Sequence, residues 1–167
     1  ASDGLSGINQ IQFSNDTGEN KTWSDTEPYA TTKTWTLTLG DNPKTVSVKF
    51  KDVAGNWSEV YSDSIILDST KPTTPIVTDD GASTISITTL NASWASNDTT
   101  SGIAEYQYKI TQDSISGITL VDWTSTDTVK SVSRSGLSLI QDRFYYFSVK
   151  AKDNAGLWSE VGYSDGI

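Results

Sequence analysis

The decapeptide Lys51–Val60, KDVAGNWSEV, returns near the C-terminus as Lys152–Val161, KDNAGLWSEV. The tryptophan is in register in the two copies and most other positions match, so we interpret the pair as an internal repeat. Each copy follows a run of alternating apolar residues and precedes another strand-like stretch. Asp, Ala and Gly between two strands are typical of a β-hairpin turn, because Asp side chains bond to the backbone and Gly readily adopts a positive φ. The repeat therefore predicts two hairpins, each closing one of two similar domains.

The composition favours an all-β protein without catalytic chemistry. The 167 residues include no Cys, no His and no Met, and the net charge is −9. Thr, Val, Ile, Tyr and Trp suit half-buried strands, and no helical periodicity is present, so the fold class predicted is all-β, with each domain a β-sandwich or a β-barrel. Without His and Cys, Ser-His and Cys-His catalytic devices are excluded, as are imidazole- and thiolate-bound metals. We therefore expect no enzyme activity.

The same composition limits the partners. No Lys/Arg cluster is present, which argues against nucleic acid, and no apolar stretch approaches the roughly 20 residues needed for membrane insertion. Because the chain contains no Met, we expect it to be a processed or excerpted part of a longer protein.

The first predicted domain covers residues 1–69. A strand is expected from Ile8 to Phe13, another up to Phe50, and a last one from Val60 to Leu67. Between them, residues 34–39 alternate cleanly. This pattern predicts a strand whose apolar members face the core together, namely Trp35, Leu37 and Leu39.

A Pro/Thr linker is expected at residues 70–75, followed by the second domain at 76–167. Its strands are predicted from apolar residues in order: Ile76 and Val77; Ile85, Ile87, Leu90, Ala92 and Trp94; Ile103 to Ile110; Val121 and Trp123; Val129 and Val132; and Tyr145 to Ala151. The motif Ser6-Gly7-Ile8 matches Ser101-Gly102-Ile103. The second domain has room for two strands before this motif, whereas the first has only a few residues. The first domain is therefore expected to lack its two N-terminal strands within this chain.

The second domain resembles a fibronectin type III domain. Trp94 and Tyr106 stand where that family keeps its buried second-strand Trp and third-strand Tyr, and Leu139 with Tyr145 is similar to its tyrosine-corner pattern. Asn154-Ala155-Gly156 matches its usual turn, although the Pro-Gly of the family's corner is absent from residues 140–143. The resemblance implies a seven-strand sandwich over roughly residues 72–167.

The first domain is similar to the Ig-like repeats of large bacterial and archaeal surface proteins. The resemblance is carried by residues 2–8, 13–16, 27–32 and 49–56, and Asp68-x-Thr70-x-Pro72 is similar to the joints between such modules. Together the two resemblances imply two tandem Ig-like, fibronectin type III-like antiparallel β-sandwiches. The resemblance of the first domain also implies an extracellular, cell-surface location and a non-catalytic spacer or adhesive role.

Calcium is the cofactor that the acidic residues suggest. In a seven-strand sandwich, the loop after the second strand and the sixth–seventh hairpin lie at the pole where the preceding domain attaches. This arrangement would gather Asp68, Asp98 and Asp153, and hard oxygen donors of this kind suit Ca²⁺. The alternative is that Asp98 and Asp153 only bond to local backbone amides, as in Asx turns.

Aromatic residues raise the possibility of a polysaccharide ligand. Trp23, Tyr29 and Trp123 are expected to be partly exposed, where flat rings could stack on sugars, whereas Trp57 and Trp158 are expected to pack over the hairpins. Five Asn-x-Ser/Thr sites are candidate glycan acceptors: Asn15, Asn20, Asn56, Asn91 and Asn97.

The missing strands of the first domain bear on assembly. An uncovered apolar sheet aggregates or captures a strand, so the missing strands must come from preceding polypeptide or from an identical subunit. Donation from subunit to subunit would build a filament or layer. The function expected is a structural or adhesive module of an extracellular surface protein, with neighbouring domains or identical subunits as partners. The alternative is a carbohydrate-binding accessory module of a secreted enzyme.

Overall fold

The computed structural model describes residue 4 and residues 6–167, and divides the chain into two compact units, Ala1–Asp68 and Ser69–Ile167. Ser2, Asp3 and Leu5, which belong to the stretch 2–8 that resembles surface-protein repeats, lie outside the described residues. Every strand that the structure describes pairs antiparallel to its neighbours, which confirms the all-β fold class. Over these same residues the structure contains no helix long and apolar enough to cross a membrane.

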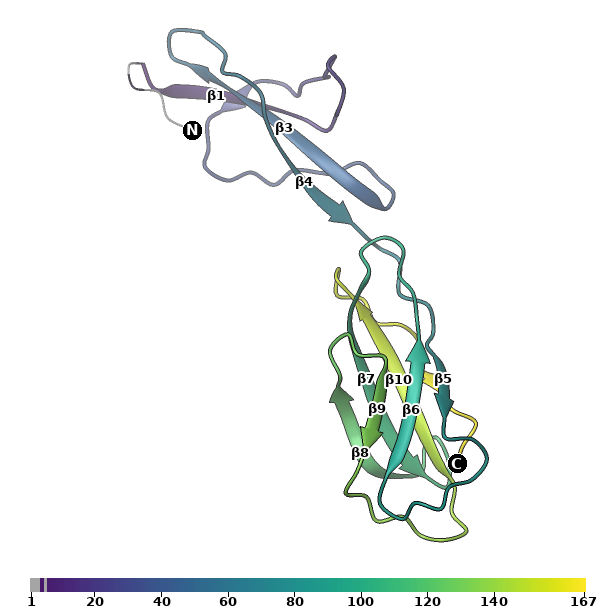
Figure 1. Cartoon of the computed structure of the whole chain (residues 1–167). Coiled ribbons are helices and arrows are strands. Elements are labelled where there is room, and N and C mark those ends of the chain that lie inside the picture. The colour runs from purple at the N-terminus through teal and green to yellow at the C-terminus, as the bar shows by residue number, and fades with distance from the viewer. Residues whose placement is uncertain (1–3, 5) are drawn as a thin grey trace. The chain divides into compact units, whose positions relative to one another are not determined.

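The first unit is a single antiparallel sheet (Figure 1). Its strands are β1 (Ile8–Ser14), β2 (Glu27–Pro28), β3 (Asn42–Asp52) and β4 (Tyr61–Leu67), in the order β2-β1-β3-β4. Of the apolar side chains that the structure describes in this unit, only that of Ile11 is buried. The apolar face of the sheet is therefore only partly covered.

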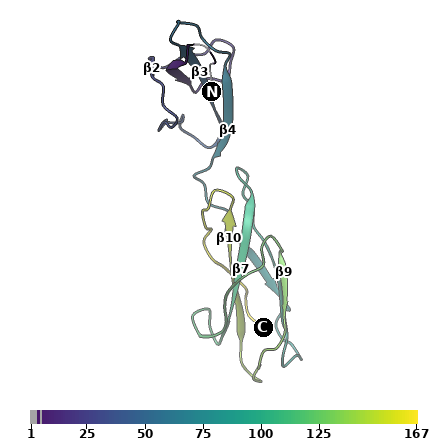
Figure 2. The same ribbon diagram turned by 90° about the vertical axis from the view of Figure 1, so that its left-hand side faces the viewer.

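The second unit has two layers. One sheet contains β5 (Ile76–Asp79), β6 (Leu90–Ala95) and β9 (Ser131–Arg134) in the order β5-β6-β9. The other contains β7 (Ile103–Gln112), β8 (Ile118–Ser125), β10 (Tyr145–Asp153) and β11 (Gly162–Tyr163) in the order β11-β10-β7-β8. Figure 2 shows β9 in a different layer from β7 and β10. This is the predicted sandwich.

An aromatic cluster joins the two layers of the second unit. Residues of β6 alternate strictly between buried and exposed, which turns Leu90, Ala92 and Trp94 inward. The Trp94 ring stacks on Tyr108 from the facing sheet, with centroids 6.1 Å apart, and Tyr108 in turn contacts Phe147 at 6.3 Å. Large flat rings bury much apolar area and stabilise the packing of the two sheets. Trp94 and Tyr106 are thus core residues, as predicted.

The two units share the pairing of their central strands. In the first unit Ile8 pairs with Asp52 and then Gln10 pairs with Lys51, so one residue of β1 is skipped. In the second unit Ile103 pairs with Asp153 and the register shifts in the same way before Lys152. A β-bulge at the same place in both units means that β1 and β3 correspond to β7 and β10.

The prediction that Trp35, Leu37 and Leu39 lie on a core strand is wrong. Residues 34–39 form no strand, and Leu39 is 96% exposed. In the second unit the corresponding strand, β9, is held by hydrogen bonds to β6. The described part of the first unit has no counterpart of β6, so residues 34–39 have no ladder to join. Trp35 instead packs on Phe13, with ring centroids 5.1 Å apart.

Two smaller predictions about strands in the second unit are also wrong. Ile85 and Ile87 lie outside β6 and are exposed, and Val129 precedes β9 and is exposed. The Ser and Thr residues around Ile85 form local side-chain bonds instead: Thr84 and Ser86 each accept a backbone N–H from a residue two or three positions ahead. Such bonds compete with strand pairing.

Residues 72–75 of the expected linker pack against the second unit. Pro72 and Pro75 are buried, and Thr73 donates its backbone N–H to the carbonyl of Asn97 at 2.9 Å. A Cβ added at Gly162 would lie 1.9 Å from the carbonyl oxygen of Pro75. This close approach fixes the start of β5 beside β11.

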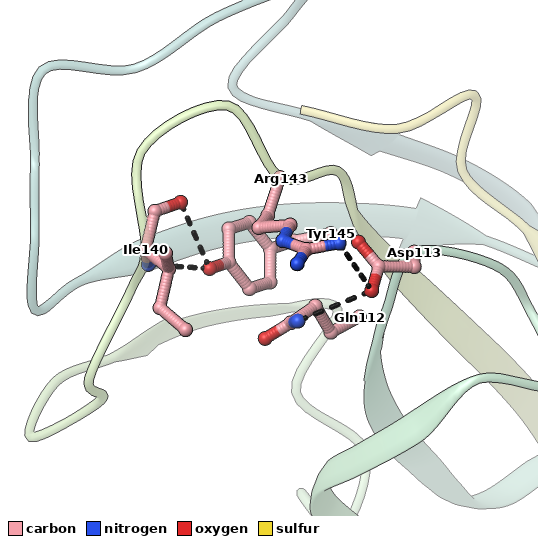
Figure 3. Close-up of polar contacts among 5 residues, drawn as sticks. All are labelled: Gln112, Asp113, Ile140, Arg143 and Tyr145. Carbon is pink, nitrogen blue, oxygen red and sulfur yellow. Dashed lines mark hydrogen bonds and ion pairs between the residues drawn. The ribbon is translucent and has the colours of Figure 1, made fainter.

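A tyrosine corner closes the second unit (Figure 3). The Tyr145 hydroxyl accepts the N–H of Ile140 at 2.6 Å and lies 3.3 Å from the carbonyl oxygen of the same residue. Asp142 adopts a φ of 60°, a left-handed conformation that Asp tolerates better than most residues. The corner therefore forms without the Pro-Gly of the family. Nearby, Arg143 pairs with Asp113 at 3.3 Å.

We expect Tyr145→Phe to lower the unfolding free energy of the second unit by about 1–2 kcal/mol, because both backbone groups of Ile140 lose their protein partner. Differential scanning calorimetry of the whole chain measures the change. Tyr163→Phe is the control, since Tyr163 is 48% exposed and its hydroxyl should contribute little. Equal melting temperatures for the two variants would contradict the role of the corner.

Candidate functional site

The repeated decapeptides form the same turn in both units. The backbone N–H of Asp52 donates to the carbonyl of Asn56 at 3.0 Å, and that of Asp153 donates to Leu157 at the same distance. Gly55 and Gly156 occupy the position with positive φ, at 98° and 99°. Both turns are followed by an isolated bridge, from Lys51 to Trp57 and from Lys152 to Trp158. The backbone of the two hairpins is therefore equivalent, as the repeat predicts.

The carboxylates at the start of the two turns have different partners. Asp52 accepts the N–H of Asn56 on Oδ1 at 2.8 Å and the side-chain amide of Asn56 on Oδ2 at 2.9 Å. Asp153 accepts the N–H of Leu157 on Oδ1 at 2.8 Å. Leu157 has no side-chain amide, and Oδ2 of Asp153 has no hydrogen-bond donor among the described residues. Asp153 is also only 1% exposed.

The hydrogen bonds to Asp52 in the first turn lower the pKa of its carboxyl group. The side-chain and backbone hydrogen bonds from Asn56 hold the pKa of Asp52 below its ordinary value of 3.8. A hydrogen bond donated to the ionised carboxylate stabilises that form, so the pKa of Asp52 is lowered.

The loop after β6 places a second carboxylate beside the second turn. Oδ1 of Asp98 accepts three backbone N–H groups at 3.1, 2.8 and 2.9 Å, from Thr100, Ser101 and Gly102. Asn154 ties this loop to the turn, because its side-chain amide donates to the carbonyl of Ser101 at 2.7 Å. One carboxylate oxygen of Asp98 lies within 4.8 Å of one of Asp153.

The acidic residues predicted to bind calcium are thus partly brought together. Asp98 and Asp153 meet at one pole of the second unit, as the strand order requires. Asp98 and Asp153 both accept local backbone N–H groups, as the alternative interpretation expects, and calcium binding by these residues stays a prediction. Asp68 is the last residue of the first unit, and its role as a third ligand stays a prediction.

A lysine lies between two tryptophans in each unit. In the first unit, Nζ of Lys49 is 4.3 Å from the ring centroid of Trp23 and 4.5 Å from that of Trp57. In the second, Nζ of Lys150 is 4.6 Å from the Trp123 centroid and 4.4 Å from the Trp158 centroid. We call each set a Trp-Lys-Trp ladder. Cation–π attraction of this kind holds the segment after the turn against the sheet.

A serine next to each ladder fixes the same segment. Ser58 accepts the backbone N–H of Phe50 on its hydroxyl at 3.0 Å, and Ser159 accepts that of Ala151 at the same distance. The backbone N–H groups of the two serines return bonds of 2.8 Å to those same residues. The Trp-Ser pair in the repeat is therefore a clamp on β3 and on β10.

The residues predicted to contact glycans have partners within the protein. Trp23 and Trp123 each have a lysine over the ring, and Tyr29 makes an edge contact with Phe50 at 6.0 Å between centroids. All three rings are half-buried. Sugar binding by these residues stays a prediction, but the ladders give Trp23 and Trp123 a structural role.

The candidate glycosylation sites lie on loops, a turn and one exposed strand position. Asn20, Asn56, Asn91 and Asn97 are exposed, and Asn15 is half-buried. Two of the side-chain amides already donate to carboxylates: Asn56 to Asp52 and Asn91 to Asp80. Asn15 accepts the indole N–H of Trp35 at 2.7 Å. A glycan at Asn15 or Asn56 would compete with these bonds.

A groove of about 740 Å³ lies next to the tyrosine corner of the second unit. Its apolar lining includes the exposed side chains of Ile85, Ile87, Ile140 and Phe144, with Arg143 and Asp142 beside them. Arg143 is engaged by Asp113, as described above.

The comparisons with known proteins add evidence on the fold. No family model matches the chain, and no curated protein matches it. The crystal structure of domains A168–A170 from titin matches 94% of this chain with a TM-score of 0.53 and 14% identity. The matched region covers about half of that structure, 53% of its chain. The solution structure of titin module A71 from human cardiac muscle has 24% identity over 58% of this chain and 88% of the module, with a TM-score of 0.36.

The chain has the fold of a tandem of Ig-like, fibronectin type III-type repeats. The geometry that recurs in both repeats holds strands together.

Sequence reasoning missed the lysines of the ladders and the exchange of Asn56 for Leu157. Both could have been found by comparing the repeats position by position. Lys49 and Lys150 stand at the same distance before their decapeptides, and Asn56 and Leu157 are aligned within them. A shared lysine indicates a common structural role, whereas an amide replaced by an apolar side chain indicates that the carboxylate beside it has a different partner.

We expect Lys150→Met to lower the unfolding free energy of the second repeat by about 1 kcal/mol, because methionine keeps the packing between Trp123 and Trp158 but removes the charge. Lys130→Met, at an exposed position, is the control. Urea unfolding of the whole chain measures both. An effect of Lys150→Met no larger than that of the control would contradict the ladder.

We expect Asn56→Leu to raise the pKa of Asp52 toward its ordinary value of 3.8, because the hydrogen bond from the Asn56 side chain is the largest cause of its lowering. A carboxyl whose folded pKa is depressed stabilises the fold above the unfolded pKa, and this contribution is lost as the pH falls from about 4 through the folded pKa. Carbon-detected NMR titration of the Asp52 carboxyl measures the change. An unaltered titration in the variant would contradict the assignment.

Proposed function

We propose that the chain is a non-catalytic structural and adhesive module of an extracellular surface protein. The observation that carries this proposal is the partly covered apolar face of the first repeat. The residues that resemble bacterial and archaeal surface repeats support the extracellular location. In this role the two repeats maintain a spacing, and the contacts at their hairpins resist separation of the strands.

The second repeat supports the interpretation of the partly covered face. There the sheet β11-β10-β7-β8 is covered by β5, β6 and β9, which bury Phe147, Val149 and Ala151 completely. In the first repeat the corresponding positions of β3, Val46, Val48 and Phe50, are only half-buried. An apolar sheet face left in water favours association with another strand or sheet.

The occupant of that face is a β-strand with alternating apolar residues, equivalent to β6. It pairs with residues 34–39, as β6 pairs with β9 in the second repeat. The strand belongs to the preceding part of the same polypeptide or to an identical subunit. In the second case each subunit completes the next, and because this contact is heterologous and does not close, it builds a filament or layer.

Hydrogen exchange tests this proposal. In the isolated chain the amides of residues 34–39 should exchange rapidly, because no strand bonds hold them. In the native surface material the same amides should be protected at least tenfold more, and electron microscopy should reveal filaments or layers if the strand comes from another subunit. The amides of β9 are the internal control. Equally rapid exchange of residues 34–39 in the native material would refute the proposal.

A carbohydrate-binding accessory module of a secreted enzyme is the alternative, and the half-buried rings of Trp23 and Trp123 are the observation behind it. A glycan array with the whole chain tests it, with Trp23→Ala and Trp123→Ala as variants. Binding that either variant abolishes, while the chain stays folded, would support the alternative. No binding at millimolar sugar would remove it.

A further inference from the structure

The carboxylate of Asp153 is buried with one oxygen unsatisfied. Asp153 is 1% exposed, and Oδ2 finds no hydrogen-bond donor among the described residues. Leaving an ionised carboxylate buried without a partner is costly, so such a group acquires a donor, a proton or a cation.

The first repeat shows which hydrogen-bond donor Oδ2 of Asp153 lacks in the second repeat. At the same place in the same turn, the Asn56 amide donates to Oδ2 of Asp52 at 2.9 Å. Leu157 replaces that asparagine in the second repeat, while the backbone bond to Oδ1 is kept at 2.8 Å. The second turn thus keeps its backbone geometry and leaves the buried Oδ2 of Asp153 without a donor among the described residues.

A second carboxylate lies close to that of Asp153. An oxygen of Asp98 lies within 4.8 Å of an oxygen of Asp153. Two oxygens bound to one Ca²⁺ lie at most about 5 Å apart, because each Ca–O distance is about 2.3–2.6 Å. Lys33, Lys71 and Arg143 form ion pairs with other carboxylates, and none of these three pairs involves Asp98 or Asp153.

The surrounding loop is held in place before any cation binds. Three backbone amides fix Oδ1 of Asp98, and the Asn154 side chain bonds to the carbonyls of Ser101 and Gly102 at 2.7 and 3.2 Å. The first repeat has Val53 where the second has Asn154, so only the second repeat can make these side-chain bonds. Both differences between the decapeptides therefore act on this pole.

We propose that the second repeat binds a Ca²⁺ ion between Asp98 and Asp153, with Oδ2 of Asp153 as a ligand. Backbone carbonyls and water complete the six to eight oxygen ligands that Ca²⁺ takes. The ion neutralises the two carboxylates and locks the loop after β6 to the β10–β11 hairpin. The proposal is independent of the proposed surface role.

Thermal unfolding of the whole chain at pH 7.5, in 5 mM CaCl₂ or 1 mM EGTA, tests the site. We expect calcium to raise the melting temperature of the second repeat by about 5 °C or more, since an ion that binds only the folded state stabilises it by mass action. Isothermal titration with CaCl₂ should give one ion per second repeat, and Asp98→Asn should weaken binding at least tenfold. MgCl₂ at the same concentration should give a smaller shift.

The matched variants are Leu157→Asn and Leu157→Ala. Leu157→Asn restores the amide of the first repeat, so it should abolish the calcium shift while the chain still melts cooperatively in EGTA. Leu157→Ala supplies no amide and should retain the shift. The proposal is refuted if the wild-type melting temperature is the same in CaCl₂ and EGTA, or if the two variants respond equally to calcium.

Discussion

The covering of one apolar sheet face by another layer is the constraint on which this structure depends. In the second repeat, Trp94 from β6 stacks on Tyr108 of the facing sheet, and the side chains of Phe147 and Val149 are completely removed from water. An antiparallel sheet with one apolar face is stable only when that face is buried. The first repeat has the same central strands with the same bulge, and differs in this covering. Its exposed Leu39 and the unpaired course of residues 34–39 both follow from that difference.

The same constraint explains which features could be predicted from the sequence. The hairpins, the sandwich and the tyrosine corner depend on local patterns, in which Asp, Gly and alternating apolar residues determine the backbone. The alternation of Trp35, Leu37 and Leu39 is equally clear, but a strand also needs a hydrogen-bonded neighbour. Periodicity reports which face a residue would occupy and does not report whether a partner strand is present. Ile85 and Ile87 were misassigned for a related reason, because nearby Ser and Thr side chains bond to the local backbone.

The candidate site was predictable only in part. Strand order alone places the loop after β6 next to the β10–β11 hairpin, so Asp98 and Asp153 could be paired from the sequence. Whether Oδ2 of Asp153 has a hydrogen-bond donor could not be predicted, because this depends on whether the side chain four residues later reaches back across the turn. Asn56 does so in the first repeat at 2.9 Å, and Leu157 cannot. Burial of Asp153 also depends on tertiary packing, which the polar character of the turn does not indicate.

Comparison of the two repeats therefore distinguishes residues with a structural role, which both repeats share, from residues that differ between them. What they share holds strands together: the glycine with positive φ, the serine that bonds to β3 or β10, and a lysine between two tryptophans. These groups satisfy one another within a repeat and need no external partner. What differs lies in the turn, where Val53 and Asn56 become Asn154 and Leu157. Neither exchange is needed for the backbone of the turn, which is the same in both repeats. The exchanges are therefore free to serve an interaction, and both alter the surroundings of one buried carboxylate.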